Sequence, residues 1–84
     1  MEQLETIVGF YGVERQKVKA IEEMWELIKA ICKNDIENIK EEMADVYVML
    51  SQLQIIYGFS DEEIEKIKKG KIKRTLETIQ CMRG

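Results

Sequence analysis

Apolar residues recur at helical spacing along most of the chain. Between about residues 14 and 32 they are spaced three and four apart, which is typical of an amphipathic helix. The stripe comprises Val18, Ile21, Trp25, Ile28 and Cys32, and it is widened by Met24, Leu27 and Ile31. An apolar arc of about half the circumference is wider than one neighbouring helix can cover. We therefore expect this helix to contact more than one partner.

A second long helix is predicted from about Asp35 to Tyr57. Its second half is apolar almost all round, which favours a central position or a subunit interface. The connection between the two helices is short, comprising Lys33 and Asn34, so the helices should fold back antiparallel. We expect Asn34 to cap the second helix, with Glu37 three residues later completing a capping box.

A last helix is predicted from about residue 61 to residue 82. Gly58 is placed to end the preceding helix, and Ser60 is placed to open the next one, with Glu63 three residues later in a second capping box. Gly70, in the middle of this helix, is predicted to mark a bend or a loose point.

These helices predict an all-α protein. Residues 2–11 add a short helix that Gly12 ends, and no proline interrupts any of the helices. A chain of 84 residues makes one small domain, which we place at residues 1–84. The predicted architecture is an antiparallel bundle of three to four helices, completed by oligomerisation.

Charge is distributed unevenly along the chain. The net charge of −3 argues against a nucleic-acid partner, because neutralising phosphates requires an excess of basic residues. Residues 22–45 hold eight acidic residues and three lysines, whereas residues 66–74 hold six basic residues and no acidic one. Such runs are usually solvated helix faces. The alternative is an acidic metal site together with a basic patch that meets phosphates.

Other features predict a cytoplasmic protein without a membrane partner. No apolar run is long enough to span a bilayer, and the N-terminus lacks the pattern of a signal peptide. Cys32 and Cys81 form no paired metal motif, so we expect them to be reduced.

Two carboxylate pairs stand at helical spacing: Glu23 with Glu26, and Glu42 with Asp45. Residues three apart project from one face of a helix, and antiparallel packing would bring the two pairs together. Glu42 also falls inside the apolar arc of its helix, where a carboxylate is costly unless it is paired or bound to metal. Four converging carboxylates require a cation, and Mg²⁺ suits oxygen ligands with no His or Cys nearby.

This chemistry fits phosphoryl transfer or hydrolysis of a phosphoanhydride. Carboxylates would hold a divalent ion, and another carboxylate would accept a proton from water. Lys71 and Arg74, three apart on the last helix, could bind other phosphate oxygens, although the residues alone favour a solvated helix face over this role. The chain has no His to activate a nucleophile or to ligate zinc.

The segments IEEMWELIKAI, NIKEEMADVYVMLSQLQIIYG and DEEIEKIKKGKIKRTLETI resemble the MazG-like branch of the all-α nucleotide pyrophosphohydrolases, over about residues 10 to 80. That family is marked by ExxE, a spacer and ExxD, which EMWE and EMAD match position by position. The resemblance implies Mg²⁺ ligation, with Mn²⁺ as a substitute, by Glu23, Glu26, Glu42 and Asp45. It also implies hydrolysis of a nucleoside triphosphate between the α and β phosphates.

The resemblance implies roles for further residues and for assembly. Lys71 and Arg74 match a basic K-x-x-R of small relatives and would contact phosphate. Glu22 and Glu41 are weaker candidates, either to support the metal ligands or to act as general base. Relatives form dimers or tetramers with sites built partly between chains, so a homodimer or homotetramer is expected. Many relatives carry an amide or aromatic residue about one turn after the ExxD aspartate, where this chain has Val48 and Met49.

Two alternatives stay open at this point. The chain could be a non-catalytic helical module for oligomerisation or interaction that keeps the same fold. It could also be similar to phosphoribosyl-ATP pyrophosphatase, which shares the fold and a similar acidic motif. The histidine that usually follows the aspartate in that enzyme is missing here, so this alternative ranks lower.

Overall fold

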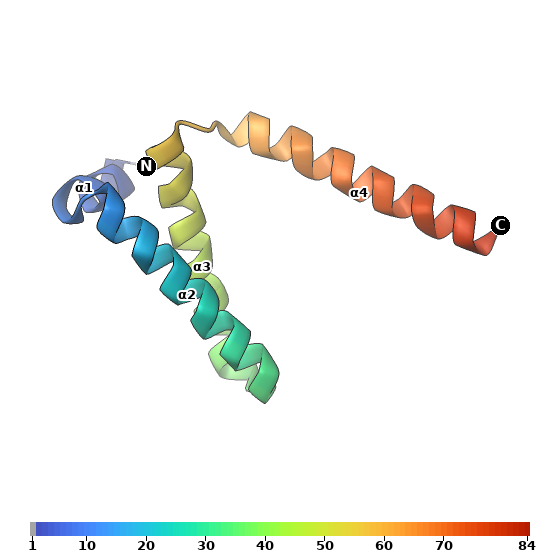
Figure 1. Cartoon of the computed structure of the whole chain (residues 1–84), viewed down its shortest axis with the longest axis horizontal. Coiled ribbons are helices and arrows are strands. Elements are labelled where there is room, and N and C mark those ends of the chain that lie inside the picture. The colour runs from blue at the N-terminus through green and yellow to red at the C-terminus, as the bar shows by residue number, and fades with distance from the viewer. Residues whose placement is uncertain (1) are drawn as a thin grey trace.

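Four helices account for nearly all of the computed structural model, which describes residues 2–84. They are α1 (Glu2–Tyr11), α2 (Val13–Lys33), α3 (Ile36–Tyr57) and α4 (Asp61–Arg83), and the described residues contain no strand (Figure 1). The predicted all-α class is confirmed. Within one chain the bundle has three helices, because α1 packs against α2 and α3 while α4 makes no comparable packing with any of them.

The pair α2 and α3 forms an antiparallel hairpin. Asn34 ends α2 in the left-handed conformation, with a φ of 55°. Asp35 then caps α3, and its Oδ1 accepts a hydrogen bond from the backbone N–H of Asn38 at 3.3 Å. The expected cap at Asn34 is therefore wrong by one residue. Asn tolerates the left-handed conformation that closes a helix, and the adjacent carboxylate takes the capping role.

Small side chains bring α2 and α3 close together. The buried apolar residues among those described are Val8 on α1, Ala20 and Ala30 on α2, and Met49 on α3. Alanine at the contact lets the two helix backbones approach closely, but it contributes little apolar area. The interior of one chain is therefore small for a protein of this length.

The widest apolar stripes lie on the outside of this hairpin. On α2, the exposed fractions are 67% for Ile21, 58% for Trp25 and 49% for Ile28; on α3, they are 63% for Tyr47 and 41% for Leu50. The face of α2 that meets α3 carries smaller and more polar residues instead. Exposed apolar surface on this scale is unusual for a monomer and typically marks an interaction surface.

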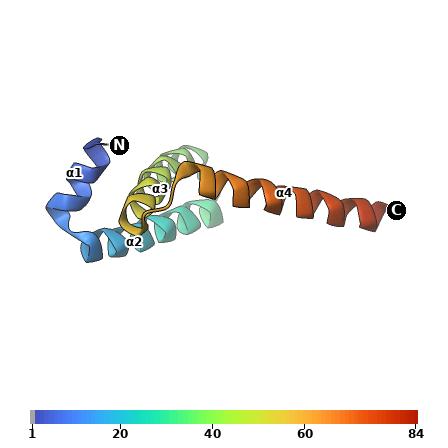
Figure 2. The same ribbon diagram turned by 90° about the horizontal axis from the view of Figure 1, so that it is seen from above.

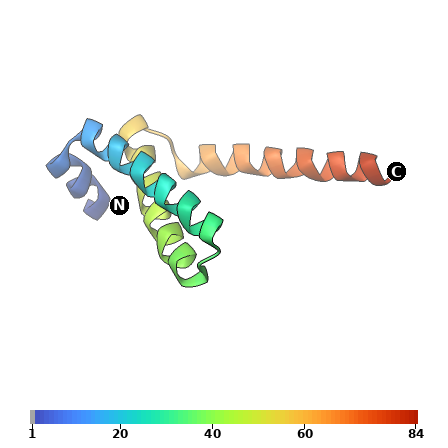
Figure 3. The ribbon, with the colours of Figure 1, turned by 60° about the horizontal axis from the view of Figure 1, so that its bottom comes forward.

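Helix α4 extends away from the hairpin in every view (Figures 1, 2 and 3). The predicted capping box opens it: Glu63 N–H donates to Ser60 Oγ at 3.1 Å, and Ser60 N–H donates to Glu63 Oε1 at 3.0 Å. The bond from the Ser60 backbone N–H, followed by the interaction with the Ser60 side chain, lowers the pKa of the Glu63 carboxyl group. The helix then runs unbroken through Gly70, where a bend or a loose point was expected. All of its residues are exposed.

Candidate metal centre

Three carboxylates converge where α2 faces α3. One oxygen atom each from Glu23, Glu42 and Asp45 lies within 4.8 Å of the other two. Glu23 projects from α2, and the other two project from one face of α3, one helical turn apart. The antiparallel hairpin therefore brings together three of the four carboxylates whose convergence the spacing predicts.

Glu42 is the carboxylate most in need of a partner. Its Oε2 atom is closed off from solvent and accepts no hydrogen bond from residues 2–84. Burial, followed by the negative charges of Asp45, Glu23, Glu26 and Glu41, raises the pKa of Glu42 above its ordinary value. A buried carboxylate oxygen without a donor requires either a proton or a cation. The residues present therefore fit a divalent cation with oxygen ligands.

We expect the raised pKa of Glu42 to make the stability of the metal-free protein depend on pH. A raised pKa in the folded state means that the folded protein binds the Glu42 proton more tightly than the unfolded chain does. The free energy of unfolding should therefore increase as the pH falls from 7 through the raised pKa towards the ordinary value of 4.5. Urea unfolding in EDTA across this window measures the effect.

Glu42→Gln provides the comparison for this experiment, since the variant cannot titrate at this position. Its free energy of unfolding should gain less than that of the wild type as the pH falls. The pKa of Glu63 is lowered in the folded state, so protonation of Glu63 decreases the free energy of unfolding as the pH falls below 4.5. This decrease occurs in both proteins. Parallel curves for the two proteins above pH 4.5 would contradict the prediction.

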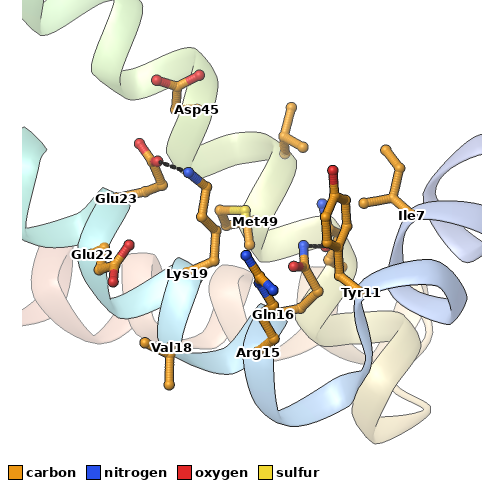
Figure 4. Close-up of a pocket in the computed structure, with 12 residues that line it drawn as sticks. Ile7, Tyr11, Arg15, Gln16, Val18, Lys19, Glu22, Glu23, Asp45 and Met49 are labelled. Carbon is orange, nitrogen blue, oxygen red and sulfur yellow. Dashed lines mark hydrogen bonds and ion pairs between the residues drawn. The ribbon is translucent and has the colours of Figure 1, made fainter.

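Lys19 already offsets part of the negative charge. Its Nζ lies 3.1 Å from Glu23 Oε1, one turn away on α2 (Figure 4). The hydrogen bond to Glu23 and the charge of that carboxylate raise the pKa of Lys19, and Asp45 contributes less. Glu26 lies outside the three-residue cluster, and its Oε1 pairs with Lys29 Nζ at 3.0 Å. Three of the four predicted ligands therefore gather in the structure.

The other predicted site residues lie outside the carboxylate cluster. Glu22 is exposed and lines the pocket beside Glu23. Glu41 is exposed on α3 and does not line that pocket. Lys71 and Arg74 lie on α4, which projects away from the hairpin (Figure 1). One chain therefore does not bring these two basic residues to its own carboxylates.

A pocket of about 770 Å³ opens directly beside the cluster. All three helices of the bundle contribute to it, and Glu23 and Asp45 form one end (Figure 4). The volume is within the range of pockets that bind small molecules, about 300–1,000 Å³. The lining of the rest of the pocket includes Tyr11 from α1, Arg15, Gln16 and Lys19 from α2, and Met49 and Gln52 from α3.

The sequence analysis selected none of these polar residues. Their spacing contains a usable signal, because Gln16 and Lys19 precede Glu23 by two turns and by one turn on the same face of α2. Gln52 follows Asp45 by two turns on α3. Plotting each helix from its acidic residue, instead of from its apolar stripe, would have selected them.

Comparison with family models identifies the family of this chain. Residues 13–76 match the model of the MazG nucleotide pyrophosphohydrolase domain. The chain belongs to the MazG family. The match contains both acidic pairs of the MazG motif, and also Lys71 and Arg74, whereas α1 with Tyr11 precedes it. No curated protein and no solved structure matches this MazG chain significantly.

Membership of the MazG family confirms the predicted resemblance and supports a nucleotide pyrophosphohydrolase. Among residues 2–84, no helix has the length and apolar character needed to cross a bilayer.

Proposed function

We propose that the protein is a Mg²⁺-dependent hydrolase that converts a nucleoside or deoxynucleoside triphosphate to the monophosphate and pyrophosphate. The observation that carries the proposal is the Oε2 atom of Glu42, which accepts no hydrogen bond within the described part of the chain. It lies among carboxylates beside a pocket of ligand size in a MazG domain. A structural ion pair would have provided this oxygen with a donor from the protein.

Glu23, Glu42 and Asp45 would hold the cation, with Glu26 as the fourth acid of the family motif. When bound, Mg²⁺, or Mn²⁺ in its place, neutralises phosphate oxygens and lowers the pKa of a coordinated water. The donor set consists of carboxylates only, which suits these hard cations better than zinc or copper.

The reaction is attack by water on the α-phosphorus, with the bond to the β-phosphate bridging oxygen breaking and pyrophosphate leaving. The protein must accept the proton that the water loses. Glu22 is the stronger candidate for this role, because its exposed carboxylate lines the pocket beside Glu23. Glu41 is the weaker candidate, because it lies outside that lining.

Arg15 and Lys19 line the pocket and can contact phosphate oxygens from within one chain. We propose that Lys71 and Arg74 do so from a second subunit. The basic α4 extends into solvent while the acidic hairpin exposes broad apolar stripes, so two copies are complementary in charge and both gain by covering apolar surface. The assembly we propose is a homodimer or homotetramer with shared sites. The location we propose is the cytoplasm, because a reducing environment suits the exposed free thiols of Cys32 and Cys81.

The proposal is tested by incubating the purified protein and Mg²⁺ with the eight common nucleoside and deoxynucleoside triphosphates, together with oxidised and deaminated forms. We expect pyrophosphate and the monophosphate to form in equal amounts from at least one of them, and EDTA to stop the reaction. If no triphosphate yields pyrophosphate, the exposed apolar surfaces favour the alternative of a non-catalytic interaction module.

A further inference from the structure

Two glutamine side chains are buried at the end of the pocket away from the carboxylates. Gln16 on α2 is 6% exposed and Gln52 on α3 is 2% exposed. Gln16 Nε2 donates a hydrogen bond to Gln52 Oε1 at 2.7 Å, and both residues line the pocket. Placing two amides in so small an interior is costly compared with apolar residues, unless their polar atoms find partners.

The bond between them leaves hydrogen-bonding capacity unused. A glutamine amide offers two N–H donors and one carbonyl acceptor. After the mutual bond, Gln16 Oε1 is available as an acceptor and Gln52 Nε2 as a donor. An acceptor next to a donor complements the Watson–Crick edge of a nucleobase, because every common base presents a donor and an acceptor side by side there.

The helical register places this pair at a suitable distance from the carboxylates. Gln16 precedes Glu23 by seven residues on α2, and Gln52 follows Asp45 by seven on α3. Because the helices are antiparallel, the two glutamines lie two helical turns from the two carboxylates along the same line. Seven residues of α-helix span about 10 Å. A nucleotide whose α-phosphate lies at the carboxylates can extend along the pocket and bring its base edge to the amides. Met49, 4% exposed, lies between the two ends and provides an apolar floor.

Tyr11 provides an aromatic surface at the same end of the pocket. It is the last residue of α1, it is 49% exposed, and it lies beside Gln16 in Figure 4. The guanidinium carbon of Arg15 lies 5.5 Å from the centroid of its ring. Aromatic rings stack on any base, with a contribution of about 1–3 kcal/mol per base in proteins that bind single strands.

We propose that Gln16 and Gln52 bind the hydrogen-bonding edge of the substrate's base and that Tyr11 packs against its face. This inference rests on the proposed function for the position of the phosphates. Base selection is thereby assigned to the two glutamines. Together with Tyr11, they would take the place of the amide or aromatic residue that many relatives carry where this chain has Val48 and Met49.

The inference is distinguished from a purely structural role by the binding of nucleoside 5′-monophosphates. A hydrogen bond that only ties α2 to α3 would affect stability without affecting the choice of base. Binding of AMP, GMP, CMP, UMP and ribose 5-phosphate to the full chain with Mg²⁺ would be measured by calorimetry. In the wild type, we expect the best monophosphate to bind at least about tenfold more tightly than ribose 5-phosphate, which lacks a base.

The main variant is Gln16→Met with Gln52→Met, which removes both amides while keeping length and volume. Replacing both partners of a buried hydrogen bond by apolar groups of similar shape is close to neutral for stability. We expect the preference over ribose 5-phosphate to fall to within about threefold, with the affinity for ribose 5-phosphate unchanged. Gln54→Met is the matched control, because Gln54 lies on the same helix, does not line the pocket and bonds to Asp61.

A second variant, Gln52→Glu, keeps the shape and the bond from Gln16 but presents an acceptor in place of the donor. We expect it to shift the preference towards GMP, because guanine offers two adjacent donors on its edge. Unchanged preferences in both variants, or a wild type that binds ribose 5-phosphate as tightly as every nucleotide, would overturn the inference.

Failure of the inference and failure of the proposed function give different results. If both variants alter base-dependent binding but no triphosphate releases pyrophosphate, the base-binding role of the glutamines is supported and the hydrolase activity is contradicted. If pyrophosphate is released but base preference is unaltered in both variants, the hydrolase activity is supported and the base-binding role of the glutamines is contradicted.

Discussion

Glu42→Gln is expected to abolish Mg²⁺-dependent release of pyrophosphate, with a loss of at least about a hundredfold. Substitution of residues that merely support a metal ligand costs 10- to 100-fold, so loss of a ligand should cost no less. The substitution keeps the shape of the side chain but removes the charge that a cation requires. It should also remove the stabilisation by Mg²⁺, which for the wild type is about 2.7 kcal/mol when the free ion is at 100 times its dissociation constant.

The same variant should be more stable than the wild type in EDTA at pH 7. Glutamine no longer places a negative charge among Glu23, Glu26 and Asp45, and its amide can donate to a neighbouring carboxylate. Thermal unfolding with and without Mg²⁺ measures both effects. Glu37→Gln is the matched control on α3, since Glu37 is 83% exposed and pairs with Lys40 on the same helix. Full activity in Glu42→Gln, or undiminished stabilisation by Mg²⁺, would exclude Glu42 as a ligand.

Mixing two inactive variants is expected to restore about a quarter of the wild-type activity. One variant carries Glu42→Gln, and the other carries Lys71→Ala with Arg74→Ala. If α4 of one subunit completes the site of its partner, each mixed dimer has one intact site and one doubly defective site. Random reassociation makes about half of the dimers mixed, and half of their sites are intact. Refolding the variants together and measuring pyrophosphate release tests this expectation.

The control for this experiment is Lys66→Ala with Lys69→Ala, which removes two exposed basic residues at the same spacing on α4. This variant should retain most of its activity when alone. Mixtures that stay inactive would show that the basic residues act within their own chain or only support folding. Full activity of the Lys71 and Arg74 variant alone would show that neither residue contacts phosphate in the reaction.

Much of the secondary structure follows directly from the sequence, because helices depend on local interactions. The period of the apolar residues predicted the long helices, and the Ser60–Glu63 pair predicted the start of α4. The error at Asn34 arose because Asn and Asp both suit helix ends. Only the backbone conformation distinguishes the residue that closes α2 from the one that opens α3.

The candidate site was only partly predictable for a different reason. Spacing places Glu23 with Glu26, and Glu42 with Asp45, on single helix faces, and the family motif names all four. Neither the spacing nor the motif determines how the two helix faces are rotated against each other. The pairing of Glu26 with Lys29 outside the cluster was therefore not predicted.

The sequence by itself determined the helices, the acidic motif and the family. Tertiary structure decided that the small Ala20 and Ala30 face α3 while Trp25 faces outward, and that α4 leaves the hairpin. It also placed Gln16 against Gln52, 36 residues apart in the chain. The physical reason is that helical periodicity fixes which side chains share a face. Which face meets which neighbour depends on packing between segments that are distant in sequence.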